Sequence, residues 1–592
     1  MAYNRYFEDE EMENLDPNNI KRVLSYLKPY KYKVALSLLL MAMAAFADLL
    51  GPYLTKVAID NYIAAGDYRG LTMISLLFIS LLAVNGLAVR FRVLIMSKVG
   101  HKVVRNIRQD LFQHIQKLSF SYFDSIPAGK IIVRVMNNVN SLQNLLENGL
   151  INIITDTFRF LAILVIMLSL DLRLTLISIT VMPILIFLIF ILKKKIRIGW
   201  RRVQKKRSNM NAYIHESLTG MQITQAFVRE EKNSGIFKDL QDDYVSNWMK
   251  TVMMSHGIFP IVLLVNTTSV IIMYLVGIRD LNAGLVTIGT LVALLQYIWR
   301  LWQPIINISN FYNQVLVANS AAERIFDVLD TEPDIVDQPD AKEMPEIKGK
   351  VEFKDVTFSY QKDSEIILKD MNFEVEPGET IAFVGATGAG KSTIINLMTR
   401  FYEIDQGSIL IDDLDIQGVK VASLRKQIGV MMQDTFIFSG SIADNIRYGN
   451  LDASRKDIEK AAEMVYADQF ISEMENGYDT EVNERGSRLS VGQRQLISFA
   501  RTILSDPKIL ILDEATSSID TQTEILIQKA TQAVLAGRTS FVIAHRLSTI
   551  RNADRIMVLE DGEIIETGSH EELMAEQGHY HDLYMAQYNR VI

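Results

Sequence analysis

Apolar residues are concentrated in the first half of this 592-residue chain, where they form long runs with few charges. A helix that crosses a membrane needs about 20 consecutive, mostly apolar residues. Buried helices of soluble proteins rarely extend so far without a polar stripe. The pattern therefore predicts six membrane-spanning helices. Their ranges are 34–58, 70–89, 148–170, 174–192, 251–278 and 281–299.

The connections between these segments differ in charge. Lys and Arg are frequent before the first span, between the second and third, and between the fourth and fifth, with the densest run at 193–207. The other connections are short and poor in basic residues. Because cytoplasmic loops carry an excess of Lys and Arg, this pattern predicts that both termini are cytoplasmic.

The two long basic connections also have a helical apolar stripe, as at Val103, Ile107 and Leu111. Each connection holds about 50 residues, and two helices of about 25 residues would reach about 35 Å beyond the bilayer. We therefore expect the spans to continue as helical stalks. Disordered basic loops would not have so regular a stripe.

The pattern changes after residue 330. Residues 331–349 contain three prolines and many acidic side chains, which is typical of a linker. Apolar and polar residues then alternate from Val351, as in a strand. We predict a membrane α-helical domain over 1–330, a linker over 331–349, and an α/β nucleotide-binding domain over 350–592.

Composition narrows the possible chemistry. The net charge of -8 argues against nucleic acid as a partner. The chain has no cysteine, which excludes disulfides, zinc–thiolate sites and thiol catalysis.

Residues 385–393 read GATGAGKST and match the phosphate-binding loop G-x-x-x-x-G-K-[ST]. An apolar strand-like run precedes them, and a helix-like run follows. Backbone N–H groups in such a loop, together with the helix N-terminus, bind phosphate, while the lysine reaches the β- and γ-phosphates and the serine binds Mg²⁺. The predicted ligand is a nucleoside triphosphate. Its candidate contacts are Gly385, Thr387, Gly388, Gly390, Lys391, Ser392 and Thr393.

A second apolar run, residues 509–512, ends in Asp513 and Glu514. In P-loop enzymes an aspartate at this position helps to hold Mg²⁺, and a following carboxylate can polarise the attacking water. The alternative is a surface carboxylate pair at the end of a strand. The upstream phosphate loop favours a hydrolytic site.

Residues 489–493 read LSVGQ and are similar to the signature motif of ABC transporter ATPases. The chain as a whole resembles a bacterial ABC exporter half-transporter of the multidrug and lipid-flippase type. That resemblance implies ATP as the nucleotide, Mg²⁺ as the cofactor, and the bacterial cytoplasmic membrane as the location. It also implies a second half-transporter as partner, because one chain has one nucleotide domain and six spans.

The resemblance implies further roles at matching positions. Tyr360 would stack on adenine, Gln433 would approach Mg²⁺ and the attacking water, and His545 would contact the γ-phosphate. Taken alone, Tyr360 would more often be a core residue and His545 a structural one. The signature and the loop between opposed domains would face the partner's ATP. Their residues are Ser490, Gly492, Gln493 and Asp520. Short crossing helices near 119–124 and 213–227 would carry motion to the spans.

Val491 departs from the family signature, which usually has glycine there. Glu514 and His545 are intact. In heterodimeric bacterial exporters, one subunit pairs a competent carboxylate and histidine with an altered signature. Val491 therefore favours a heterodimer in which this chain is the competent half. The alternative is a homodimer that tolerates valine.

The substrate has weaker sequence signals. Asp48 lies within an apolar span. An ionisable side chain there has a high free-energy cost and is often functional. Its carboxylate would bind amphipathic cations. Alternatively, a neighbouring helix pairs with the carboxylate, or the carboxylate lies near a wet interface. The main functional hypothesis is export of amphipathic drugs. Lipid flipping or peptide export from the same fold, and a non-transporting ATP-gated regulator, are the alternatives.

Overall fold

The computed structural model describes residues 16–361, 364–433, 435–513, 521–543 and 547–591. The chain forms two compact units. The first holds residues up to 116 and 129–330, and the second holds 117–128 and everything from Thr331 onward. Each unit has its own hydrophobic core.

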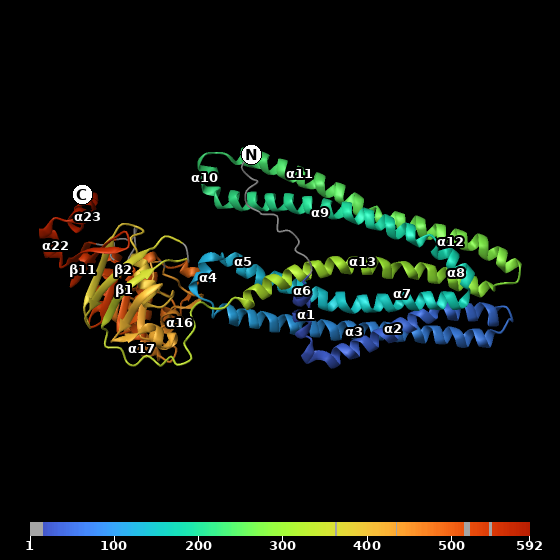
Figure 1. Cartoon of the computed structure of the whole chain (residues 1–592), viewed down its shortest axis with the longest axis horizontal. Helices are drawn as coiled ribbons and strands as arrows, with labels where there is room; N and C mark the ends of the chain where they lie inside the picture. Colours follow the sequence, from blue (N-terminus) through green and yellow to red (C-terminus); the bar gives the residue numbers. More distant parts are fainter. Residues whose placement is uncertain (1–15, 362–363, 434, 514–520, 544–546, 592) are drawn as a thin grey trace. The chain divides into compact units, whose positions relative to one another are not determined.

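The first unit is helical (Figure 1). Its helices are α1 (Pro17–Ser25), α2 (Lys31–Val57), α3 (Tyr68–Ile115), α5 (Ala128–Val133), α6 (Val139–Asn144), α7 (Leu150–Leu170), α8 (Leu172–Ile179), α9 (Met182–Thr219), α10 (Met221–Ala226), α11 (Glu230–His256), α12 (Ile258–Asn282) and α13 (Ile288–Asp330). Helix α13 packs against α7 and α2, α2 packs against α3, and α9 lies beside α11.

Large apolar side chains cover much of the outside of this unit. Met73, Phe190 and Leu275 are 77%, 75% and 71% exposed. Within the described residues, four helical runs are long and apolar enough to cross a membrane: Lys28–Ile63, Tyr68–Ile115, Ala128–Leu170 and Glu230–Asn282. They contain the predicted first, second, third and fifth spans.

The predicted fourth and sixth spans differ from the structure. The prediction of one helix over 174–192 is wrong, because α8 ends at Ile179 and α9 begins at Met182. Pro183 in the first turn of α9 disfavours a continuous helix at this point. The predicted start at residue 281 is also wrong, because α12 continues to Asn282 and α13 begins only at Ile288. The turn at 283–287 contains the apolar residues Leu285 and Val286, so hydropathy places the connection too early in the chain.

Both long basic connections are largely helical. Helix α3 has 48 residues, and α9 has 38. About 20 residues suffice to cross a bilayer, so each of these helices continues well past the length of a span. The structure thus builds the connections as helical extensions.

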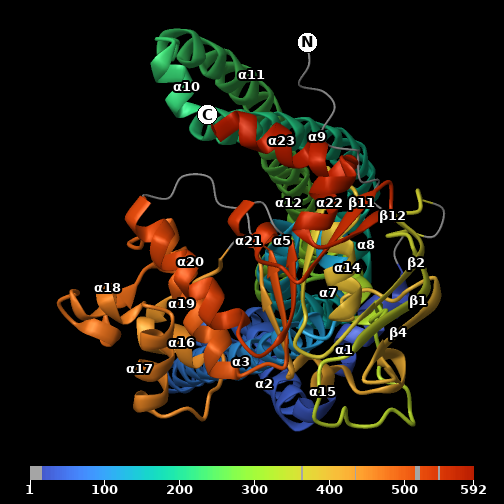
Figure 2. The same ribbon diagram turned by 90° about the vertical axis from the view of Figure 1, so that its left-hand side faces the viewer.

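The second unit contains a mainly parallel sheet and an antiparallel sheet (Figure 2). The parallel sheet has the strand order β12–β11–β3–β10–β9–β6, and the antiparallel sheet β2–β1–β4–β5. Strand bounds are β1 (Val351–Phe358), β2 (Leu368–Val375), β3 (Thr380–Gly385), β4 (Gln406–Ile411), β5 (Leu414–Asp415), β6 (Ile428–Met431), β7 (Gly440–Ser441), β8 (Glu481–Val482), β9 (Ile509–Asp513), β10 (Thr539–Ile543), β11 (Arg555–Glu560) and β12 (Glu563–Gly568).

The second unit also contains helices, and they pack on both faces of the parallel sheet. Their bounds are α4 (Phe120–Ser125), α14 (Lys391–Met398), α15 (Val421–Arg425), α16 (Ile442–Arg447), α17 (Arg455–Met464), α18 (Asp468–Ser472), α19 (Val491–Ser505), α20 (Thr521–Leu535), α21 (Leu547–Arg551), α22 (His570–Glu576) and α23 (His579–Val591). Helix α14 contributes to the core shared with the antiparallel sheet, and α16 to α20 gather on the other side.

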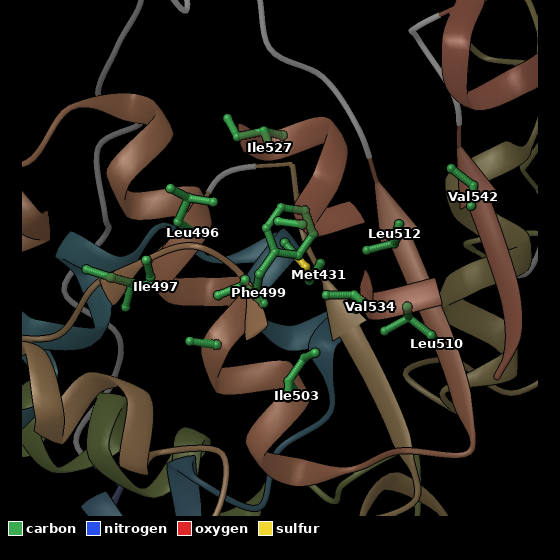
Figure 3. Packing of buried hydrophobic residues seen from close by; sticks show 14 of the residues in the cluster. Met431, Leu496, Ile497, Phe499, Ile503, Leu510, Leu512, Ile527, Val534 and Val542 are labelled. Carbon is green, nitrogen blue, oxygen red and sulfur yellow. The ribbon is translucent and has the colours of Figure 1, made fainter. Parts of the chain in front are cut away.

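Strand β9 illustrates why both faces are buried. Ile509 and Ile511 point into the core shared with α14, while Leu510 and Leu512 point into the core shared with α19 and α20. Leu510, Leu512, Phe499 and Ile527 meet in the second of these cores (Figure 3). Continuous apolar strands of this kind are typical of a parallel sheet with helices on both faces.

Candidate nucleotide-binding site

The phosphate loop connects β3 to α14 and depends on two of its glycines. A Cβ at Gly385 would lie 2.2 Å from the carbonyl oxygen of Leu559 on the neighbouring strand β11. Gly390 has φ +104°, and a Cβ there would lie 2.6 Å from Cδ2 of Leu368. Both positions therefore require glycine for packing and backbone conformation. Thr387 and Gly388, at the turn of the loop, are exposed.

Lys391 is 9% exposed and turns back into the loop. Its ammonium group donates to the carbonyl oxygens of Gly385 and Ala386, each at 2.8 Å. Burial lowers the pKa of Lys391, and the nearby charge of Asp513 opposes this shift. A phosphate anion in the loop would stabilise the charged ammonium further. The site therefore suits a polyphosphate.

The parallel strands bring the other described candidates to the same edge of the sheet. Ile543, at the end of β10, pairs with Phe383 of β3 on one side and Asp513 of β9 on the other. Strand β6 pairs with β9 as far as Met431, and the exposed Gln433 follows two residues later. The carboxyl ends of these strands thus align with the phosphate loop. Ser392, in the first turn of α14, is exposed there.

Three predicted site residues, Glu514, Asp520 and His545, lie outside the described part of the chain. The strands that precede two of them are described. Strand β9 ends at Asp513, the residue before Glu514, and β10 ends at Ile543, two residues before His545. Their roles stay predictions.

Tyr360 follows β1 and lies beside the start of α14. Its hydroxyl hydrogen-bonds with Thr393 Oγ1 at 3.1 Å. Its ring makes edge contacts with Phe358 and Tyr402, each with ring centres 5.0 Å apart. The side chain remains 40% exposed, so the ring keeps surface that a purine base can cover.

The signature residues begin α19. The hydroxyl oxygen of Ser490 accepts from Gln493 N–H at 3.2 Å, and the Gln493 side chain accepts from Ser490 N–H at 2.9 Å. This reciprocal cap satisfies two backbone donors at the helix N-terminus. Val491, at the first helical position, is 44% exposed.

Gly492 has a packing role that the signature motif does not reveal. A Cβ at this position would lie 2.1 Å from Cγ2 of Thr523 in α20. The glycine therefore allows α19 and α20 to approach closely, whatever it contributes to nucleotide binding. The two residues are far apart in sequence, and the motif alone gave no signal of this contact.

Asp48, the candidate substrate residue, is paired with arginines. Its carboxylate accepts from Arg300 Nη1 at 2.7 Å and lies 3.8 Å from Arg159 Nε. Arg300 lies one residue beyond the predicted sixth span, so the hydropathy pattern gives no sign that it pairs with Asp48. Nearby, Asp156 accepts from Asn307 at 2.9 Å. The geometry favours the alternative in which neighbouring helices satisfy Asp48.

Known proteins are similar to this chain over nearly its whole length. The family model described as ABC transporter transmembrane region matches residues 34–304, and that described as ABC transporter matches residues 368–517. The ABC transporter ATP-binding protein YknV of Bacillus subtilis, named as uncharacterized, is 42% identical over 574 residues, which cover 96% of this chain and 95% of YknV. An ATP-dependent lipid A-core flippase of Syntrophus aciditrophicus is 35% identical, with coverage of 96% and 94%.

Two further similarities point to the same group of proteins. YgaD of Bacillus subtilis, whose name describes multidrug export, is 35% identical, with coverage of 96% of this chain and 99% of YgaD. The structure of a bacterial Atm1-family ABC exporter with ATP bound is similar with a TM-score of 0.79 and 29% identity, covering 94% of this chain and 98% of that one. This chain therefore belongs to the ABC exporters, as a half-transporter whose ATP-hydrolysing domain is coupled to transport.

Proposed function

We propose that this half-transporter uses ATP hydrolysis to export amphipathic drugs or other hydrophobic compounds across the cytoplasmic membrane, as one half of a dimer. The observation that carries the proposal is the phosphate loop with its buried Lys391, on the sheet edge that also holds Asp513 and Gln433. The exposed apolar helices of the first unit supply the membrane part.

The residues at this edge have distinct tasks in the proposed reaction. The loop N–H groups and Lys391 bind the phosphates, and the ring of Tyr360 supports adenine. Glu514 takes a proton from the attacking water, Gln433 orients that water, and His545 contacts the γ-phosphate. Together these groups place water in line with the bond that breaks.

Mg²⁺ fits the oxygen donors present. The exposed hydroxyl of Ser392 begins α14, and the carboxylate of Asp513 and the amide oxygen of Gln433 project from the same edge. Mg²⁺ prefers oxygen ligands and is commonly bound by one or two side chains together with substrate phosphates. When bound, the ion neutralises charge on the β- and γ-phosphates.

The signature completes the site of a partner. Ser490, Gly492 and Gln493 begin a capped helix whose N-terminus suits an anion, while Asp520 belongs to the loop proposed to communicate between the domains. The exposed Val491 would meet the partner's γ-phosphate. We favour a heterodimer because this position departs from glycine while the chain keeps Glu514 and His545.

Orientation follows from charge. The basic runs before the first span and within the two long connections favour a cytoplasmic location for those segments, for both termini and for the ATPase domain. In this proposal six segments cross the membrane, the fourth formed by α8 with the start of α9 and the sixth by α13 from Ile288 onward. Lipid flipping is the second candidate, supported by the 35% identity to a lipid A-core flippase. Intact Glu514 and His545 argue against a non-transporting regulator.

Glu514→Gln should remove most turnover and spare ATP binding, because only the proton acceptor is lost. Phosphate release should fall about a hundredfold or more, within the usual contribution of a general base. Glu576→Gln, at an exposed glutamate at the end of α22, is the matched control and should retain full activity. Undiminished phosphate release in Glu514→Gln would contradict the assignment.

Tyr360→Ala should raise the KM for ATP about tenfold, since stacking of a base on an aromatic ring contributes about 1–3 kcal/mol. Tyr360→Phe keeps the ring and loses only the hydrogen bond to Thr393, so its KM should change much less. Steady-state ATPase assays over a range of ATP concentrations measure both. An unaltered KM in Tyr360→Ala would rule out the stacking role.

The purified chain alone should hydrolyse ATP slowly, and co-expression with a half-transporter that has glycine at the signature position should restore turnover. Val491→Gly should by itself raise the ATPase of the chain alone, because it removes bulk next to the partner-bound phosphate. Strong ATPase and transport by the unmodified chain alone would show that it works as a homodimer.

Asp48→Asn should reduce export of cationic and neutral dyes equally, because it leaves Arg300 and Arg159 without their shared carboxylate. The Tm of the full-length protein should fall by about 2–5 °C, as expected when a partly buried ion pair loses one member. Adding Arg300→Gln should recover part of that loss. A selective defect with cationic dyes would instead assign Asp48 to substrate recognition.

A further inference from the structure

Helix α4, a six-residue segment between the long helices α3 and α7, belongs to the compact unit that binds nucleotide. The backbone N–H of Ile335 donates to the hydroxyl of Ser119, just before α4, at 3.2 Å. The hydroxyl of Ser121 donates to the carboxylate of Asp334. The segment is thus fixed at one end to the chain that follows α13.

The other contacts of α4 are aromatic and converge on Tyr402. The ring of Phe120 lies 5.5 Å from that of Phe401 and 6.5 Å from that of Tyr402. The hydroxyl of Tyr402 donates to the carboxylate of Asp124 at the other end of α4. Burial, and then this hydrogen bond, raise the pKa of Tyr402, so the phenol stays a proton donor under physiological conditions.

Tyr402 also contacts the candidate adenine site. Its ring is 8% exposed and meets the edge of Tyr360 at 5.0 Å and that of Phe358 at 5.9 Å. Tyr360 in turn hydrogen-bonds with Thr393 in α14. A continuous series of contacts therefore leads from Asp124 through Tyr402 and Tyr360 to the helix that follows the phosphate loop.

The residues that precede Tyr402 are held by hydrogen bonds and a cation–π contact. The guanidinium of Arg425 lies over the ring of Phe401 at 4.7 Å and donates to the carbonyl oxygen of Arg400. Arg400 is 3% exposed and donates to the carbonyl oxygens of Ile416 and Val419. Because the residues before Tyr402 are fixed, displacement of α4 is expected to act on its ring and hydroxyl.

We propose that Tyr402 is a positioning residue that transmits the placement of α4 to Tyr360 and so sets the affinity of the site for ATP. The inference rests on the proposed function, in which Tyr360 supports adenine. Coupling of this kind is reciprocal, so bound ATP would equally favour one placement of α4. The ligand that reports on it is ATP itself.

The test uses the full-length dimer in lipid vesicles and measures the KM for ATP and kcat. Tyr402→Phe removes only the hydroxyl, and Asp124→Ala removes only its acceptor. Each should raise the KM about threefold, a part of the usual contribution of one hydrogen bond, with a smaller change in kcat. Asp124→Asn keeps an acceptor and should retain more of the affinity. Since one bond is lost in either case, the double variant should be no worse than the single ones.

Tyr478→Phe is the matched control. Tyr478 is a buried tyrosine of the same unit whose hydroxyl donates to Asp468 at 2.8 Å, and its described ring contacts do not include Tyr360. It should lose a similar hydrogen bond without a change in KM. A purely structural role for Tyr402 predicts that the two variants behave alike.

The inference would be overturned by an unchanged KM in Tyr402→Phe, by an equal rise in Tyr478→Phe, or by additive effects of Asp124→Ala and Tyr402→Phe. Failure of the stacking role is a separate result, because Tyr360→Ala reports on it directly. If Tyr360→Ala raises the KM and Tyr402→Phe does not, stacking stands and transmission fails. If only Tyr402→Phe raises it, the route through Tyr360 is wrong.

Discussion

Two-sided burial of the parallel strands is the constraint on which the ATP-binding unit depends. Alternate residues of β9 enter two different cores, so a shift of one residue would exchange them. With the register fixed, β3, β10, β9 and β6 end at one edge. The loop after β3, Asp513 and Gln433 therefore meet there without any direct bond between them being needed. Chemistry at this edge is a consequence of how the sheet packs.

In the transmembrane unit, several polar side chains are paired across helices, and α13 supplies a partner in each of four such pairs. Tyr297 donates to the carbonyl oxygen of Leu49 at 2.6 Å, and Trp302 donates to Asn266 at 2.5 Å. Arg300 and Asn307 bind the carboxylates of Asp48 and Asp156. Polar residues in these spans thus hold α13 to its neighbours, and a polar residue within a span is weak evidence for a substrate contact.

The sequence predicted the parts of the molecule whose signals are local. Each of three motifs lies within a few residues of sequence: the phosphate loop, the apolar β9 ending in Asp513, and the signature. Each motif by itself indicates the backbone conformation that it needs. Pairings over long separations were missed, such as Asp48 with Arg300, Gly492 with Thr523 and Asp124 with Tyr402. Hydropathy placed the turn between α12 and α13 several residues too early, because Leu285 and Val286 continue the apolar pattern through it. Only the folded chain reveals which distant residues meet.

Positions 491 and 492 of the signature differ in how closely the packing of the helices constrains them. Gly492 is held by its close approach to α20, whereas the side chain at 491 points away from the core and is 44% exposed. A substitution at 491 therefore leaves the packing of α19 against α20 intact, whereas any side chain at 492 would force the two helices apart.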